Sequence, residues 1–102
     1  MSRYRLTGAA EADLAGIFWQ GLERFGAVQT ERYLTDLEAQ FDLIADFPEI
    51  ARLRGELINP VRAHPHSAHI IIYEIEPSGI AILRIRAAAE NWAMIPLGED
   101  EP

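Results

Sequence analysis

Cysteine and lysine are both missing from this chain of 102 residues. The absence of cysteine excludes disulfides, thiolate metal sites and cysteine nucleophiles. Because lysine is absent, all nine permanently cationic side chains are arginines, whose planar forks bind carboxylates and phosphates bidentately. No apolar run approaches the roughly 20 residues of a membrane span, and the N-terminus lacks the basic and then apolar plan of a signal peptide. These absences favour a cytoplasmic protein with no membrane partner.

Known signatures of catalysis are scarce as well. The sequence contains no nucleophile elbow, phosphate-binding glycine loop or dinucleotide fingerprint. Its three histidines, His64, His66 and His69, form an H-P-H-x-x-H pattern, but no carboxylate stands nearby at ligand spacing and Pro65 disturbs the strand geometry. We therefore interpret them as exposed loop or edge residues, and we expect no metal, no cofactor and no catalytic residue in these motifs.

Charge is distributed unevenly along the chain, whose net charge is −7. Residues 1–49 hold four arginines and nine acids, residues 50–89 hold five arginines and three acids, and residues 90–102 hold four acids and no base. A basic sheet beside an acidic helical half is the expected result. Because a pI near 4.8 is unlike that of a dedicated nucleic-acid binder, we expect a protein partner and no direct sequence-specific binding of nucleic acid.

Length and composition indicate one globular domain. Hydrophobic residues make up 49% of the chain and charged residues 25%, which is ordinary for a single modest core. We assign residues 1–97 to this domain. Residues 98–102 are polar and acidic, and we expect them to form a disordered tail.

Two helices are predicted by apolar residues that recur at spacings of three and four, over residues 9–25 and 28–47. Gly26 suits a helix C-terminal cap, and Pro48 ends the second helix. Because the break between the helices is short, they should form an antiparallel hairpin. Gly21 lies inside the first helix at a cost of about 1 kcal/mol relative to alanine, which a close helix–helix approach would offset.

Strands are predicted on both sides of this helical pair. Residues 3–6 form one candidate and 61–66 another, while residues 49–60 read as a connecting loop with room for one helical turn. A hairpin with a period of two surrounds the turn residues 76–79, and its apolar positions on both faces make it a central pair. On its second run the alternation separates two faces: Ile80, Ile82, Arg84 and Arg86 against Ala81, Leu83 and Ile85. The predicted class is α+β, with the order β-αα-βββ and the helices on one face of a small antiparallel sheet.

Arginines at the end of a core strand are not explained by burial. If the strand over 61–66 pairs beside the hairpin, Arg62, Arg84 and Arg86 could approach one another on the sheet. One interpretation is that they pair with Glu74, Glu76 or the tail. The other is that they form an anion or carboxylate site for a partner. Both stay open at this point.

The chain resembles a ParE-type toxin of the ParE/RelE superfamily, the toxin half of bacterial type II toxin–antitoxin modules. The resemblance spans roughly residues 3–92, and its motifs are individually weak but specific in order and spacing. They are Tyr4-Arg5-Leu6-Thr7, Ala10-Glu11-Ala12-Asp13-Leu14, Arg24-Phe25-Gly26, Glu31-Arg32-Tyr33-Leu34, Phe47-Pro48-Glu49, Glu56-Leu57, Arg62, Ile72-Tyr73 and Gly79-Ile80 through Leu83-Arg84-Ile85.

The resemblance implies the same β-αα-βββ layout and a ParD-like antitoxin as partner, bound on the apolar surface of helices 9–25 and 28–47 and of the sheet. It also implies inhibition of DNA gyrase, through target contacts that we assign to Arg62, Arg84, Arg86 and Trp92. Such a toxin acts by binding, not by its own catalysis. A homodimer and a toxin–antitoxin heterotetramer both stay open.

RelE relatives instead cut mRNA on the ribosome, and in that alternative the arginines would contact phosphate while Tyr73 or a histidine transfers protons. The acidic, lysine-free composition and the position of Tyr73 in mid-strand favour the gyrase branch. Ala87-Ala88-Ala89 stands where relatives commonly carry His-Gly-Arg or another polar, basic run. We hypothesise that this change weakens or abolishes toxicity and leaves a module that only binds antitoxin. The alternative is that the three alanines begin a short C-terminal helix.

Overall fold

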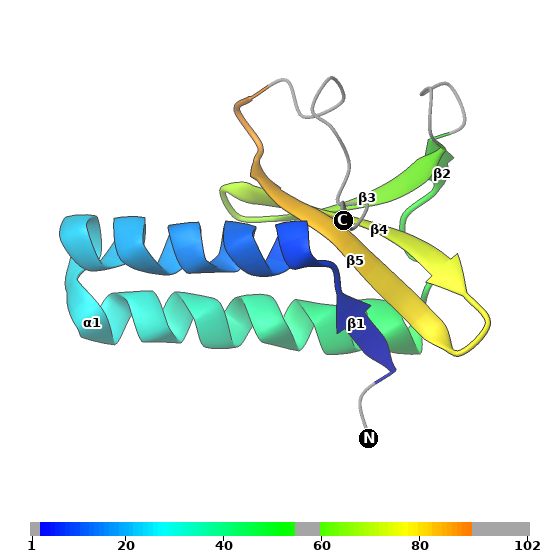
Figure 1. Cartoon of the computed structure of the whole chain (residues 1–102), viewed down its shortest axis with the longest axis horizontal. Helices are drawn as coiled ribbons and strands as arrows, with labels where there is room; N and C mark the ends of the chain where they lie inside the picture. Colours follow the sequence, from blue (N-terminus) through cyan, green and yellow to red (C-terminus); the bar gives the residue numbers. More distant parts are fainter. Residues whose placement is uncertain (1–2, 55–59, 91–102) are drawn as a thin grey trace.

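The computed structural model describes residues 3–54 and 60–90, which form a helical layer against one face of a five-stranded sheet (Figure 1). The predicted α+β class is confirmed. The predicted tail over 98–102 and Trp92 lie outside the described residues. In chain order, the elements are β1 (Tyr4–Leu6), α1 (Gly8–Asp46), β2 (Leu53–Arg54), β3 (Val61–His66), β4 (His69–Glu76) and β5 (Gly79–Ala87). Within the described ranges, α1 is not apolar enough to cross a membrane.

The element α1 is a hairpin of two helical arms, because Gly26 leaves the helical conformation at φ 83° and ψ 173°. Its first arm runs from residue 8 to the break and its second arm from the break to residue 46 (Figure 1). Thr7 caps the start: its Oγ1 accepts the backbone N–H of Ala10 at 3.0 Å and donates to the carbonyl of Leu83 on β5 at 2.8 Å. The predicted antiparallel pair of helices is therefore confirmed.

The two arms touch closely where Gly21 faces Thr30. A Cβ placed on Gly21 would lie 2.8 Å from the Thr30 side chain, so only glycine fits without a shift. The expected close approach, which offsets the low helix propensity of glycine, is confirmed. The sequence shows a glycine inside a predicted helix, and the contact with Thr30 explains why a glycine is needed there.

The sheet has the strand order β1-β5-β4-β3-β2. Strands β2 to β5 pair antiparallel, as predicted, but β1 runs parallel to β5, with Tyr4 opposite Ile80. The prediction of a wholly antiparallel sheet is wrong at this edge. The long excursion through α1, β2, β3 and β4 separates β1 from β5, and a connection of that length permits parallel pairing, whereas a tight turn does not.

A short strand, β2, lies within the segment that we expected to be a loop. Leu53 and Arg54 pair with Arg62 and Val61 of β3. Two residues are too few to show a period of two, so pairing with β3 alone makes this segment a strand. Within the described residues, no strand pairs with the rest of the outer edge of β3, where Pro65 is exposed and needs no partner for an N–H group.

A β-bulge in β5 changes which side chains share a face. Ile72 pairs with Arg84 and Tyr73 with Ile82, so Leu83 has no partner on β4. Beyond Leu83 the alternation is shifted by one residue. The predicted grouping of the arginines with Ile80 and Ile82 is therefore wrong.

After the bulge, Ile85 joins the core against α1, and both arginines of β5 lie on the opposite face of the sheet. The core on the helix side contains buried side chains from both layers, among them Leu37, Phe41, Ile71, Tyr73 and Ile82. A second cluster on the other face contains Val61, Ile72, Ala81 and Leu83. The prediction that the hairpin is central and apolar on both faces is confirmed.

Ala87 is the last residue of β5, and Ala88 and Ala89 lie in a turn. The backbone N–H of Ala88 donates to the carbonyl of Ala68 at 2.8 Å, which extends the contact between β5 and the β3–β4 turn. The alternative in which the three alanines begin a helix is therefore wrong. Residue 89 faces solvent, so a larger side chain could be placed there without disturbing the core.

Candidate functional site

Asp13 on the first arm of α1 binds both arginines at the end of β5. Its carboxylate accepts Nε and Nη2 of Arg84 at 2.7 and 3.0 Å, and Nη1 of Arg86 at 3.1 Å. The Asp13 side chain is only 8% exposed, and the side chains of Arg84 and Arg86 are 15% and 25% exposed. The geometry is that of a charge-assisted, bidentate pair, which is stronger and more directional than a neutral hydrogen bond.

The same carboxylate also closes the edge of the sheet. Strand β1 covers β5 only from Ile80 to Ile82. Just beyond it, the backbone N–H of Ile85 donates to Oδ2 of Asp13 at 2.9 Å. Asp13 thereby replaces a strand partner at a place where an edge would otherwise be open to pairing with another chain.

Glu90 completes this group, which we call the arginine network: Asp13, Arg84, Arg86 and Glu90. Its carboxylate accepts Nε and Nη2 of Arg86 at 2.8 and 3.0 Å, and the backbone N–H of Ala87 at 3.0 Å. The hydrogen bonds from Arg86 lower the pKa of Glu90, and the same contact raises the pKa of Arg86. Two cations and two anions alternate, so the network has no net charge.

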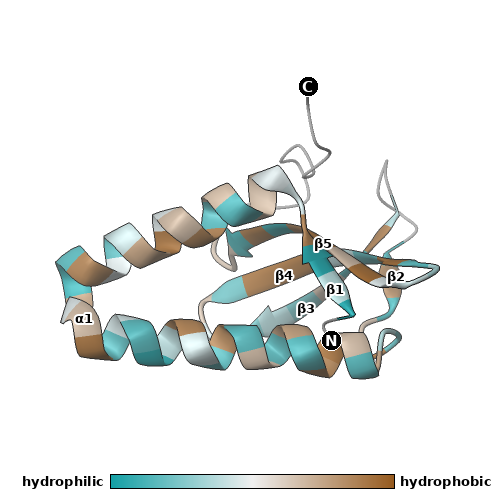
Figure 2. Cartoon of the chain, turned by 60° about the horizontal axis from the view of Figure 1, so that its bottom comes forward, coloured by the Kyte–Doolittle hydropathy of each residue, from teal (hydrophilic) through white to brown (hydrophobic). Residues whose placement is uncertain are grey.

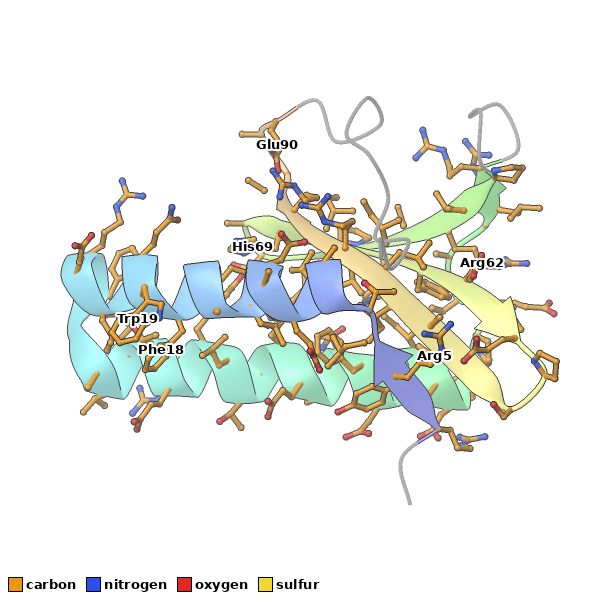
Figure 3. All side chains as sticks on the ribbon, viewed as in Figure 1. Arg5, Phe18, Trp19, Arg62, His69 and Glu90 are labelled. Atoms are coloured by element: carbon orange, nitrogen blue, oxygen red, sulfur yellow. The ribbon has the colours of Figure 1, made fainter. Side chains whose placement is uncertain are left out.

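Arg62 does not belong to this network. It lies opposite Tyr73, on the face of the sheet that packs on α1, and its Nη1 donates to the carbonyl of Ala51 at 2.7 Å. Figure 3 shows Arg62 beside β2 and β3, away from Glu90 at the end of β5. The prediction that Arg62 approaches the two arginines of β5 is wrong, because the bulge turns those two to the other face.

The predicted pairing of the arginines of β5 with Glu74 or Glu76 is also wrong, whereas the predicted pairing with the tail lies outside the described residues. Glu76 binds Arg5 of β1, with Oε2 3.0 Å from Nε, and the arginines of β5 bind Asp13 and Glu90 instead. Asp13 was missed because it is one of many acids on an amphipathic helix, and nothing local distinguishes it. Its contact with Arg84 spans 71 residues of sequence.

The histidines form a second polar group, at the end of the sheet where the β3–β4 turn meets the second arm of α1 (Figure 3). The hydroxyl of Tyr33 lies 2.6 Å from Nδ1 of His69, and its ring packs beside those of His66 and His69. Nε2 of His64 lies 2.8 Å from Oε1 of Gln40. The prediction that these histidines are exposed is wrong, because each is half-buried against or beside the helix.

Burial explains the titration of this group. It lowers the pKa of both His64 and His69, since the charged imidazolium is poorly solvated there, and the charge of His66 acts in the same direction. The carboxylate of Glu90 partly counteracts this at His69. Burial also raises the pKa of Tyr33. In residues 3–54 and 60–90 no three His, Cys, Asp or Glu side chains are grouped as metal ligands.

Tyr73, the candidate for proton transfer in a ribonuclease, is fully buried in the core. Its hydroxyl donates to the carbonyl of Pro48 at 2.6 Å, and burial raises its pKa. A phenol in this position holds the end of α1 against the sheet. The predicted core role of Tyr73 is confirmed.

A hollow of about 530 Å³ lies between the two arms of α1, the β3–β4 turn and the end of β5. We call it the hairpin hollow. Apolar atoms form most of its surface, although polar residues outnumber apolar ones in its lining. Its residues are Ile17, Gln20, Gly21, Arg24, Phe25, Gln29, Thr30, Arg32, Tyr33, Asp36, Ser67, Ala68, His69 and Ala87.

The fold and these sites define a small α+β protein with an arginine-bearing sheet beside a helical hairpin. The same fold occurs in the solved structure of the chromosomal ParDE TA system from P. aeruginosa, with a TM-score of 0.71 and 21% identity over 85% of this chain and 96% of that one.

Sequence comparison gives the family. Residues 4–92 match the family model of the ParE toxin of the type II toxin–antitoxin system parDE. Toxin ParE1 of Mycobacterium tuberculosis is 33% identical over 85 residues, which cover 82% of this chain and 87% of that protein. Toxin ParE1 of Caulobacter vibrioides is 29% identical over 91 residues, 89% of this chain and 92% of that protein. The chain belongs to the ParE toxin family of type II toxin–antitoxin systems.

Proposed function

We propose that this chain inhibits DNA gyrase by binding it, and that a ParD-like antitoxin neutralises it. The observation that carries this proposal is the match to the ParE toxin family over residues 4–92, nearly the whole domain. The inhibition needs no catalytic group of its own. In agreement with that, the hydroxyl of Tyr73 is engaged inside the core, where it has no route to a substrate.

Of the two arginines at the end of β5, Arg86 is the better placed for target contact. Its side chain is 25% exposed, whereas that of Arg84 is 15% exposed and held by both oxygens of Asp13. We therefore assign Arg86 to direct contact with the target and Arg84 to positioning of the strand end. Trp92, which lies outside the described residues, stays a proposed contact. Arg62 stays a proposed contact on a separate part of the surface.

The first test is a plasmid supercoiling assay with purified gyrase, ATP and this chain, with and without the antitoxin encoded beside it. Linear or relaxed plasmid that disappears when the antitoxin is added supports the proposal. Arg86→Gln should weaken this effect, and Glu23→Gln, an exposed charge on α1, should not. Unchanged supercoiling at saturating toxin, both with this chain and with the triple variant described next, would contradict the gyrase assignment.

The alanines after β5 allow a second form of the same assay. The triple variant Ala87→His, Ala88→Gly and Ala89→Arg should inhibit gyrase more strongly, because it restores donors and a positive charge beside Arg86. Residues 87–89 are exposed, so the fold should tolerate the change. An equal effect of the two forms would reject the idea that the alanines weaken toxicity.

A further inference from the structure

The end of β5 presents three N–H donors to one carboxylate. Oε1 of Glu90 accepts Nε of Arg86 at 2.8 Å and the backbone N–H of Ala87 at 3.0 Å, and Oε2 accepts Nη2 of Arg86 at 3.0 Å. The edge of a guanidinium beside a backbone N–H fits any carboxylate, whether or not it belongs to the same chain. The chain therefore fills a carboxylate site with a side chain of its own.

The two acids of the arginine network differ in what they hold together. The contacts of Asp13 span 71 to 73 residues of sequence, and its side chain is 8% exposed. The start of the first arm of α1 lies beside β5 in Figures 1 and 2, so Asp13 connects two elements. The side-chain contacts of Glu90 reach only three and four residues back, and its side chain is 31% exposed. Glu90 can therefore leave its place without separating any two elements of the fold.

Glu90 in its observed position prevents a partner from using Arg86. Both N–H groups of the guanidinium edge, at Nε and Nη2, bind Glu90, and Nη1 binds Asp13. An anion of another molecule therefore gains a bidentate contact with this edge only after Glu90 is displaced. A carboxylate that displaces it restores the same three hydrogen bonds, so the exchange loses none of them.

We propose that Glu90 occupies a binding site for an acidic side chain of gyrase, which displaces Glu90 and binds Arg86 and the backbone N–H of Ala87. The contact between Glu90 and Arg86 is thus autoinhibitory, because it lowers the affinity of this chain for its target. The inference rests on the proposed function, since it takes gyrase as the target and Arg86 as the contact.

The charge around the site favours a carboxylate over a phosphate of DNA. One carboxylate that replaces another keeps the arginine network neutral. Residues 90–102 hold four acids and no base, and the whole chain has a net charge of −7. A DNA strand would bring further phosphates toward these acids, and their repulsion would weaken its binding.

A titration with acetate tests the site without the target. In the NMR spectrum, the arginine Nε–H signal that is missing from Arg86→Gln reports on this contact. Acetate should shift this signal in Glu90→Gln, because a neutral amide binds the guanidinium weakly, and should leave it unchanged in the wild type at the same concentration. Glu74→Gln, which removes an exposed acid from β4, is the control and should respond as the wild type does. Equal responses of the wild type and Glu90→Gln would overturn the assignment of Glu90.

Binding to gyrase free of DNA tests the partner. By titration calorimetry, we expect Glu90→Gln to bind about tenfold more tightly than the wild type, because no internal carboxylate competes for Arg86. Glu74→Gln should bind as the wild type does, and the double variant Arg86→Gln, Glu90→Gln should lose the gain. A purely structural role of Glu90 predicts equal or weaker binding by Glu90→Gln, and that result would overturn the proposal.

Two other results separate this inference from the proposed function. A gain that is measured only with gyrase on DNA would assign the displacing group to a phosphate and overturn the acidic side chain. Absence of gyrase binding by both the wild type and Glu90→Gln would overturn the proposed function and the identity of the partner. The acetate titration would still decide whether Glu90 occupies a carboxylate site.

Discussion

Asp13 accepts hydrogen bonds from Arg84, Arg86 and the backbone of Ile85 while its side chain is 8% exposed. One carboxylate thus neutralises a partly buried cation, shares a second one and closes a strand edge. A buried charge that loses its partner is costly, whereas the pair itself contributes little net stability. Substitution of Asp13 alone is therefore the most sensitive test of its contribution to stability.

Asp13→Asn should lower the free energy of unfolding by about 2–4 kcal/mol, because it removes the negative charge that two guanidinium groups of restricted solvation share, and it leaves Arg86 with Glu90 alone. Urea denaturation at neutral pH measures this difference. Glu23→Gln serves as the control, since an exposed acid on the same arm should change stability by less than about 0.5 kcal/mol. Equal effects of the two substitutions would mean that the arginine network does not stabilise the fold.

At the scale of elements, glycines determine where α1 breaks and how closely its two arms pack. Gly26 breaks the helix with a positive φ, and Gly21 permits the arms to touch at Thr30. Gly16, by contrast, has no neighbour within 4 Å of the position of a Cβ. Three glycines on one hairpin thus have three different roles, and their positions in the sequence do not distinguish the last two.

Gly16→Ala should stabilise the protein by about 1 kcal/mol, because alanine gains helix propensity at an open position. Gly21→Ala should instead destabilise it by about 1 kcal/mol or more, since its Cβ would meet the Thr30 side chain at 2.8 Å and overpacking outweighs the gain. Thermal and urea unfolding of the two variants measure the contrast. If both were stabilised alike, the close contact between the arms would be refuted.

At the scale of the whole molecule, the histidines connect the sheet to α1 in a way that depends on protonation. Burial lowers the pKa of His64 and His69, so the folded state favours their neutral forms. Around His69 stand Tyr33, His66 and Glu90, and a proton on Nδ1 of His69 would prevent this nitrogen from accepting a hydrogen bond from the Tyr33 hydroxyl. The docking of the β3–β4 turn on α1 is therefore sensitive to acid.

The contribution of these histidines to the free energy of unfolding should be constant above about pH 7.5 and should fall as the pH is lowered through 6.5, the ordinary pKa that they regain on unfolding. The sign follows because the unfolded chain binds these protons more readily than the folded one. Urea denaturation between about pH 7.5 and 5.5 measures the slope. His69→Gln should show a shallower slope than the wild type. If His69→Gln and the wild type had the same slope, the pH dependence of stability would come from groups other than His69.

Much of the architecture follows from local signals. The apolar stripes over 9–25 and 28–47, Gly26 and Pro48 are sufficient to predict the helical hairpin, and the period of two over the last strands predicts the central pair. These features are readable because each depends on residues within a few positions of one another. The family resemblance was readable for the same reason, since its motifs are short and keep their order.

The tertiary structure alone decided the rest. The parallel pairing of β1, the strand β2 and the bulge at Leu83 depend on which segments meet, and a one-residue bulge reverses the face of every residue after it. For that reason the arginines of β5 are separated from Arg62 and bind Asp13, 71 residues away from Arg84 in the sequence. The sequence by itself determined the elements other than β2 and the supply of arginine forks. Only the tertiary structure determined which carboxylates pair with these arginines, because the sequence around an acid on an amphipathic helix does not indicate which strand it will contact.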